Sequence, residues 1–113
     1  MLKEEYLFRE GCFISELHNT PDDPGISVAR ARVLPGESTK WHSLSGITER
    51  YLILEGAGIV ETGDLLPRET HVGDLINIPP GMRQRITNDG STDLIFLAIC
   101  TPRFTPDAYN SLI

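Results

Sequence analysis

The sequence predicts an all-β fold, and three observations lead to this prediction. Clusters of turn residues recur along the chain at the eight- to twelve-residue spacing that is typical of a small β-sandwich or barrel. The segments between them are rich in β-branched and aromatic residues, which favour strands. No segment carries a sustained helical period, and frequent glycines and prolines would interrupt one. We therefore expect one small β-barrel domain over residues 1–113.

The expected elements follow from these punctuation points in chain order. Strands are predicted at 12–17, 26–34, 49–54, 59–62, 75–78, 85–87 and 94–100. The tail is the best helix candidate, because Thr105 can cap a helix and Pro106 suits a first helical turn. A short C-terminal helical turn within 106–112 is therefore expected to close the chain.

Composition limits the partners. Lys and Arg number 10 against 16 Asp and Glu, a formal net charge of -6, which disfavours nucleic acid and anionic membrane surfaces. The longest apolar run, 94–100, is too short to span a bilayer, and the N-terminus lacks the apolar centre of a secretory signal. The two cysteines, Cys12 and Cys100, lie in apolar strand-like runs and are expected to be buried and free. These features predict a cytoplasmic protein.

Strand parity identifies polar residues that share a face. Side chains alternate along a strand, so Glu49, Tyr51 and Ile53 lie on one side of the 49–54 segment. Small barrels can enclose one ligand, and inward-facing polar residues are therefore the first place to look for function.

Two spaced motifs then indicate a family. The first consists of a glycine, a histidine, a glutamate and a second glycine, namely Gly36, His42, Glu49 and Gly56. The second follows about seventeen residues later and consists of Gly73, Pro79, Gly81, Gln84 and Asn88. In order and spacing, this pair resembles the two motifs of the cupin superfamily, small single-domain bacterial members above all. The resemblance implies a double-stranded β-helix, the cupin jelly-roll barrel.

The resemblance also implies an interior site, although the metal-binding motif is degenerate. Cupins bind a divalent metal through two histidines and a glutamate of the first motif and a histidine of the second. His42 and Glu49 match two of these positions, whereas Leu44 and Gln84 occupy the other two. Leucine cannot coordinate, and a glutamine oxygen is a weaker ligand than imidazole. The implied set of His42, Glu49 and Gln84 would hold zinc, iron, nickel or manganese weakly, and no organic cofactor is implied.

The same residues admit a metal-free interpretation. His42 can be an interior imidazole that pairs with Glu49, because a buried carboxylate needs a partner, a ligand or a proton. Tyr51 is expected in the same cavity, either as a proton donor or as a filler with a satisfied hydroxyl. By parity, Trp41 points away from His42, and the small side chains of Ala29 and Ala31 face inward.

The resemblance implies small-metabolite chemistry rather than one activity. The first hypothesis is isomerisation, epimerisation or elimination on a sugar, a sugar phosphate or a hydroxy or keto acid, with His42, Glu49 and Tyr51 as catalytic residues. The alternatives are a metal-dependent dioxygenase and a non-catalytic small-molecule sensor. A homodimer is also expected, since exposed sheet edges favour pairing. The substrate, the metal and the dimer geometry do not follow from the sequence.

Overall fold

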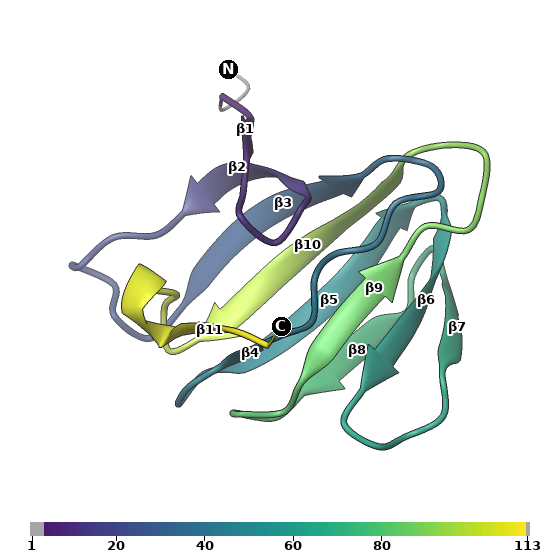
Figure 1. The fold of residues 1–113 in the computed structure, drawn as a ribbon. Coiled ribbons are helices and arrows are strands. Elements are labelled where there is room, and N and C mark those ends of the chain that lie inside the picture. Colours follow the sequence, from purple (N-terminus) through teal and green to yellow (C-terminus); the bar gives the residue numbers. More distant parts are fainter. Residues whose placement is uncertain (1–3, 113) are drawn as a thin grey trace.

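The chain forms two antiparallel β-sheets, and the computed structural model describes residues 4–112. The first sheet has the strand order β1-β2-β3-β10-β5-β8 and the second the order β11-β4-β9-β6-β7 (Figure 1). The strands of the first sheet are Tyr6–Leu7 (β1), Phe13–His18 (β2), Ser27–Val33 (β3), Leu94–Thr101 (β10), Thr48–Glu55 (β5) and Leu75–Ile78 (β8). Those of the second are Tyr109–Ser111 (β11), His42–Leu44 (β4), Gln84–Thr87 (β9), Ala57–Thr62 (β6) and Arg68–His71 (β7). The all-β prediction is confirmed.

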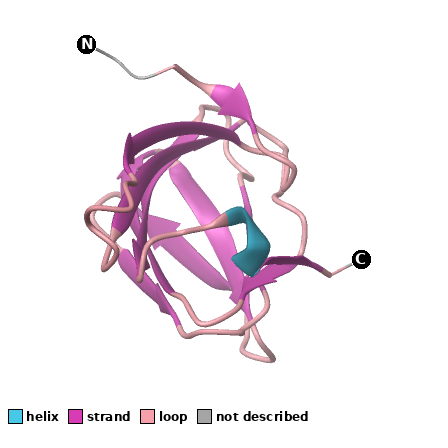
Figure 2. Cartoon of the chain, turned by 90° about the vertical axis from the view of Figure 1, so that its left-hand side faces the viewer, coloured by secondary structure: helices cyan, strands magenta, loops and turns pink. Residues whose placement is uncertain are grey.

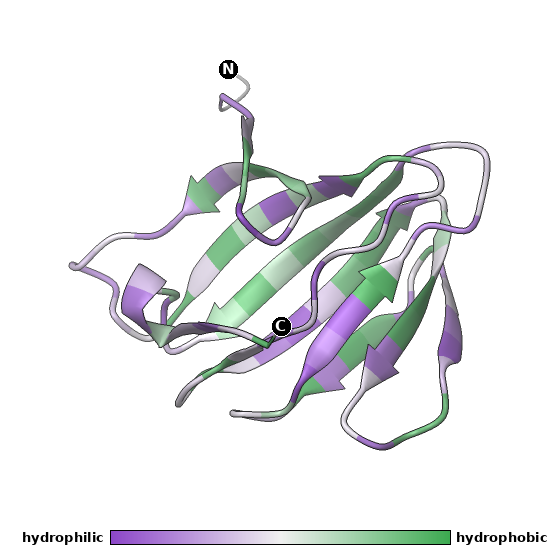
Figure 3. Cartoon of the chain, in the orientation of Figure 1, coloured by the Kyte–Doolittle hydropathy of each residue, from purple (hydrophilic) through white to green (hydrophobic). Residues whose placement is uncertain are grey.

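Strand β10 is central to the first sheet and carries its register. It pairs with β3 on one side and with β5 on the other. Figure 3 shows β10 as apolar along nearly its whole length, as expected for a strand that other strands cover on both edges. In this register Cys100 lies opposite Glu49 and Ala98 opposite Tyr51. These four positions therefore share one face of the sheet.

That inner face packs against the second sheet to form the core. The central cluster contains the fully buried side chains Val33, Ile53, Ile78, Ile86, Leu94 and Phe96. Most come from strands with a strict inside-outside alternation, such as β8 and β9. Apolar burial of this kind drives the two sheets together.

The C-terminus differs from the expectation of a helical turn over 106–112. Only Pro106–Ala108 is helical, as a single 3-10 turn, and Thr105 makes no capping hydrogen bond through its side chain. The next residues, Tyr109–Ser111, form β11 and pair with β4. A short isolated helix is marginal in water, and strand pairing satisfies the same backbone groups. In Figure 2 the 3-10 turn lies across the end of the ring of strands that faces the viewer.

Several facing predictions are confirmed, and three further strands were not anticipated. Cys12 and Cys100 are buried and free. Trp41 points outward, where the guanidinium of Arg83 lies 4.3 Å from its ring centroid. The unanticipated strands are short or polar and have little signal in the sequence, namely β1, β4 and β7. No helix within residues 4–112 is long and apolar enough to cross a membrane.

Candidate active site in the barrel interior

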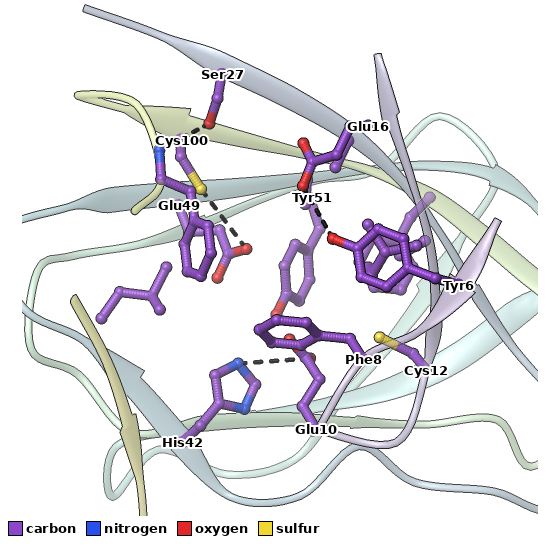
Figure 4. A pocket seen from close by; sticks show the side chains of 17 residues that line it. Tyr6, Phe8, Glu10, Cys12, Glu16, Ser27, His42, Glu49, Tyr51 and Cys100 are labelled. Atoms are coloured by element: carbon purple, nitrogen blue, oxygen red, sulfur yellow. Dashed lines mark hydrogen bonds and ion pairs between the residues drawn. The ribbon is translucent and has the colours of Figure 1, made fainter. Parts of the chain in front are cut away.

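A cavity opens between the two sheets at the end where the terminal segments lie. Its volume is about 550 Å³, open mouth included. Its wall combines residues of the inner strand faces with residues of the N-terminal segment (Figure 4). The lining side chains are Tyr6, Phe8, Glu10, Cys12, Ile14, Glu16, Ser27, Ala29, Ala31, His42, Leu44, Glu49, Tyr51, Phe96, Ala98, Cys100 and Phe104. A cavity of this size can hold one small metabolite.

His42 enters the cavity from β4 with a defined orientation. Its side chain is buried, and Nδ1 lies 2.7 Å from the backbone oxygen of Lys40. A carbonyl oxygen only accepts, so Nδ1 carries the proton and donates it in this bond. The Tyr109 ring stacks on the imidazole at 5.2 Å. Burial lowers the pKa of His42, and the bond to Lys40 opposes this only in part. The ring is therefore neutral near pH 7, with an unshared pair on Nε2.

Glu10 faces this unshared pair, and sequence reasoning missed it. Its Oε2 lies 3.6 Å from His42 Nε2, as the dashed line in Figure 4 marks. Burial raises the pKa of Glu10 to about 7. A signal was present, because Glu10, Cys12, Ile14 and Glu16 alternate along the chain and all line the cavity. The expected partner of His42 in the metal-free interpretation was Glu49, whereas the carboxylate in ion-pair contact is that of Glu10.

Glu49 enters the cavity from β5 and is incompletely satisfied. The residue is 8% exposed, and its Oε1 has no hydrogen-bond partner among the described residues. Its Oε2 has only a weak contact, with the Cys100 thiol at 3.9 Å. Burial raises the pKa of Glu49 to about 7, and the negative charge of Glu10 contributes to the rise. Near neutral pH this carboxyl is therefore partly protonated.

Tyr51 and Gln84 form a polar pair beside Glu49. The Tyr51 hydroxyl donates a hydrogen bond to Oε1 of Gln84, which orients the Gln84 amide. The remaining amide group lies close enough to Glu49 to oppose the rise in its pKa. Burial raises the pKa of Tyr51 well above its usual value, so its hydroxyl keeps its proton. Tyr51 thus positions the amide and is a poor acid.

The donor set does not fit the metal site of the full cupin motif. Leu44 lines the cavity where that motif has a histidine. The Gln84 oxygen already accepts from Tyr51. Within residues 4–112, no group of three or more His, Cys, Asp or Glu side chains is arranged to hold a metal ion. The structure thus brings His42, Glu49 and Tyr51 to one cavity and buries Gln84 beside Tyr51, but it does not assemble a metal-ligand cluster from these residues.

Comparison with known proteins supports the fold. A double-stranded β-helix protein from Klebsiella pneumoniae superposes with a TM-score of 0.79 at 16% identity, over 94% of this chain and 88% of that one. A predicted oxalate decarboxylase from Thermotoga maritima gives a TM-score of 0.78 at 26% identity, over 89% and 93%. Streptomyces PAC13, solved with uridine, gives 0.81 at 17% identity, over 98% and 85%.

Sequence comparison identifies the family. No curated protein matches the chain significantly. The family model described as the cupin domain, by contrast, matches residues 29–100, which is more than half of the chain. The matched segment includes His42 and Glu49 in the first motif and Gln84 in the second. The chain therefore belongs to the cupin domain family.

Proposed function

We propose that this protein catalyses proton transfer on a small polar metabolite, in an isomerisation, epimerisation or dehydration. His42 acts as the base and the carboxyl of Glu49 as the acid. The observation that carries the proposal is the bond from His42 Nδ1 to the Lys40 carbonyl, because it leaves the unshared pair of Nε2 in the cavity. A general base and a carboxyl that retains its proton near pH 7 then share one enclosed space.

A dehydration illustrates the chemistry. Nε2 of His42 takes a proton from a carbon, and that electron pair forms a carbon–carbon double bond. Glu49 gives its proton to the departing hydroxyl, which leaves as water. The carboxylate of Glu10, 3.6 Å from Nε2, stabilises the imidazolium that forms. Transfer of the proton from His42 to Glu49 restores the starting state.

Two structural neighbours support this class of reaction. Pac13, a nucleoside dehydratase, superposes with a TM-score of 0.79 at 17% identity. KdgF from Halomonas gives a TM-score of 0.78 at 16% identity. At these identities the likeness concerns the fold, and the assignment of roles depends on the cavity of this chain.

The test is deuterium exchange, because proton abstraction leaves a trace whichever product forms. The protein is incubated in D₂O and EDTA with neutral sugars, polyols, nucleosides and amines, and recovered compounds are analysed by NMR and mass spectrometry. We expect one class to gain deuterium at carbon or to lose water. His42→Asn should lower that rate about 10²- to 10⁴-fold, the contribution of a general base.

The control is His71→Asn, which replaces an exposed histidine on β7 and should retain the full rate. Full activity of His42→Asn would exclude His42 as the base. Ligand binding without deuterium uptake or product across the panel would favour a sensor and contradict the proposed catalysis.

A second prediction concerns metal affinity. The sequence-based site of His42, Glu49 and Gln84 remains a weak-site prediction, because one donor is missing and another is engaged. Leu44→His combined with Gln84→His should bind Zn²⁺ more than about tenfold more tightly than the wild type, since imidazole supplies both missing ligands. Titration against a competing chelator measures this. Arg85→His, next to Gln84 but on the other face of β9, serves as control. Unchanged affinity in the double variant would show that the four positions do not converge on one ion.

We also propose a homodimer formed through the outer face of the first sheet. Leu97, Leu52 and Leu75 lie side by side across β10, β5 and β8, and Leu75 is 55% exposed. Strand β8 is also a sheet edge, whose unpaired backbone groups favour association. Light scattering should give twice the mass of one chain, and Leu75→Glu should shift it toward one. A wild-type monomer at high concentration would contradict the proposal.

A further inference from the structure

The charge of the cavity wall is one-sided. Three acidic side chains line the cavity, namely Glu10, Glu16 and Glu49. Among residues 4–112, no Lys or Arg lines it. Arg9 is near, but its guanidinium lies over the Tyr109 ring at 4.1 Å and donates to the backbone oxygen of Pro106. An anionic ligand would therefore meet repulsion without a compensating cation.

One carboxylate oxygen in the cavity awaits a donor. Oε1 of Glu49 is buried and has no hydrogen-bond partner in the described part of the chain, and in Figure 4 the Glu49 side chain points into the cavity. An unsatisfied buried polar atom is costly, and a ligand N–H placed there would remove the cost. Charge-assisted bonds from an ammonium group to a carboxylate are stronger than bonds between neutral groups.

Aromatic rings complete the wall on the side of the N-terminal segment. Tyr6, Phe8 and Phe104 all line the cavity. Phe8 is the central ring, with centroids 6.5 Å from Tyr6 and 6.0 Å from Phe104 in edge-on contacts. The Tyr6 hydroxyl donates to Glu16 at 3.1 Å, which places a carboxylate next to these rings. Ring faces attract organic cations but do not ligate metal ions.

We propose that the cavity binds a small organic cation, a molecule with a primary or quaternary ammonium group and no acidic group. The ammonium lies between the carboxylates and the aromatic rings, and the rest of the molecule reaches toward His42. This inference uses the same cavity as the proposed function and names its substrate class. Of the substrates that the family resemblance implied, sugar phosphates and hydroxy or keto acids are thereby disfavoured.

The test compares molecules of one shape and different charge. Choline is the probe, 3,3-dimethyl-1-butanol is its uncharged carbon isostere, and 3-hydroxypropanoate is the anion. Binding is followed by NMR titration and by thermal shift, in EDTA so that no metal bridges ligand and protein. We expect choline to bind at least about tenfold more tightly than the isostere, and the anion to give no shift. Equal binding of choline and its isostere, or tighter binding of the anion, would overturn the inference.

Variants locate the site and separate the two proposals. Glu16→Gln removes a cavity charge that the proposed chemistry does not use, and it should weaken choline binding about threefold to tenfold. Glu69→Gln, an exposed carboxyl on β7, should leave binding unchanged. Equal effects of the two variants would contradict binding in this cavity. Cation selectivity without turnover of any amine would retain this inference and refute the proposed catalysis, whereas turnover of uncharged substrates with no cation selectivity would do the opposite.

Discussion

Replacing Glu49 with glutamine should stabilise the protein at pH 8 by about 3 kcal/mol more than it does at pH 5. The pKa of Glu49 is about 7 in the folded protein, against a model value of 4.5. Each unit of difference corresponds to about 1.36 kcal/mol, which gives this order of magnitude.

The sign follows from proton binding. Between pH 4.5 and 7 the folded state holds the Glu49 proton more tightly than the unfolded state, so the stability contributed by Glu49 is lost as pH rises through this window. Glu10 acts in the same direction. His42 acts in the opposite direction, because burial lowers its pKa and favours the neutral ring as pH rises. The difference between the wild type and Glu49→Gln isolates the contribution of Glu49.

Urea unfolding at a series of pH values measures this difference. Glu69→Gln, at an exposed position, should keep the wild-type pH profile. Parallel profiles for the wild type and Glu49→Gln would show that the Glu49 carboxyl is not held in a desolvated environment.

The second large effect is expected at Gly56, at the junction of β5 and β6. Its φ of +78° is strained for other residues, and a Cβ atom there would lie 2.6 Å from the backbone oxygen of Asp93. The nearest Leu94 atom is also backbone, its Cα at 3.2 Å, so no side chain can rotate away. Gly56→Ala should cost about 3 to 5 kcal/mol, the sum of backbone strain and overpacking.

Gly36 provides a matched control. Its φ is +81°, but nothing lies within 4 Å of the position that a Cβ would occupy. Gly36→Ala should therefore cost only the strain, about 1 to 2 kcal/mol. Chemical denaturation of both variants tests the pair. Equal losses of unfolding free energy would mean that the β5–β6 junction shifts easily and that the close approach to Asp93 has no cost.

The sequence contained much of the barrel and part of the cavity. Period-two alternation placed Glu49 and Tyr51 on one face, and both line the cavity. The motif spacing led to the family, which the match over residues 29–100 confirms. These signals are local, or repeat at fixed distances, and a single chain displays them directly. The roles assigned to His42, Glu49, Tyr51 and Gln84 remain predictions.

What the sequence did not disclose depends on contacts between distant segments. Glu10 lies in a turn, and its approach to His42 requires the N-terminal segment to fold across the barrel. Strand β11 exists because β4 offers it a partner, and the local signal at Pro106 favours a helix instead. The hydroxyl–amide pair of Tyr51 and Gln84 likewise joins different sheets. Tertiary context decides such positions, and local propensity does not.

The position of the N-terminal segment has an evolutionary consequence. Its turn and first strands supply Phe8, Glu10 and Glu16 to the cavity, and all three precede the 29–100 stretch that defines the family. The conserved barrel can therefore stay intact while exchange of this one segment changes the charge and aromatic content of the chamber. Grafting residues 4–18 onto a related barrel should transfer ligand preference with it, so that selectivity in such proteins is inherited as a detachable module.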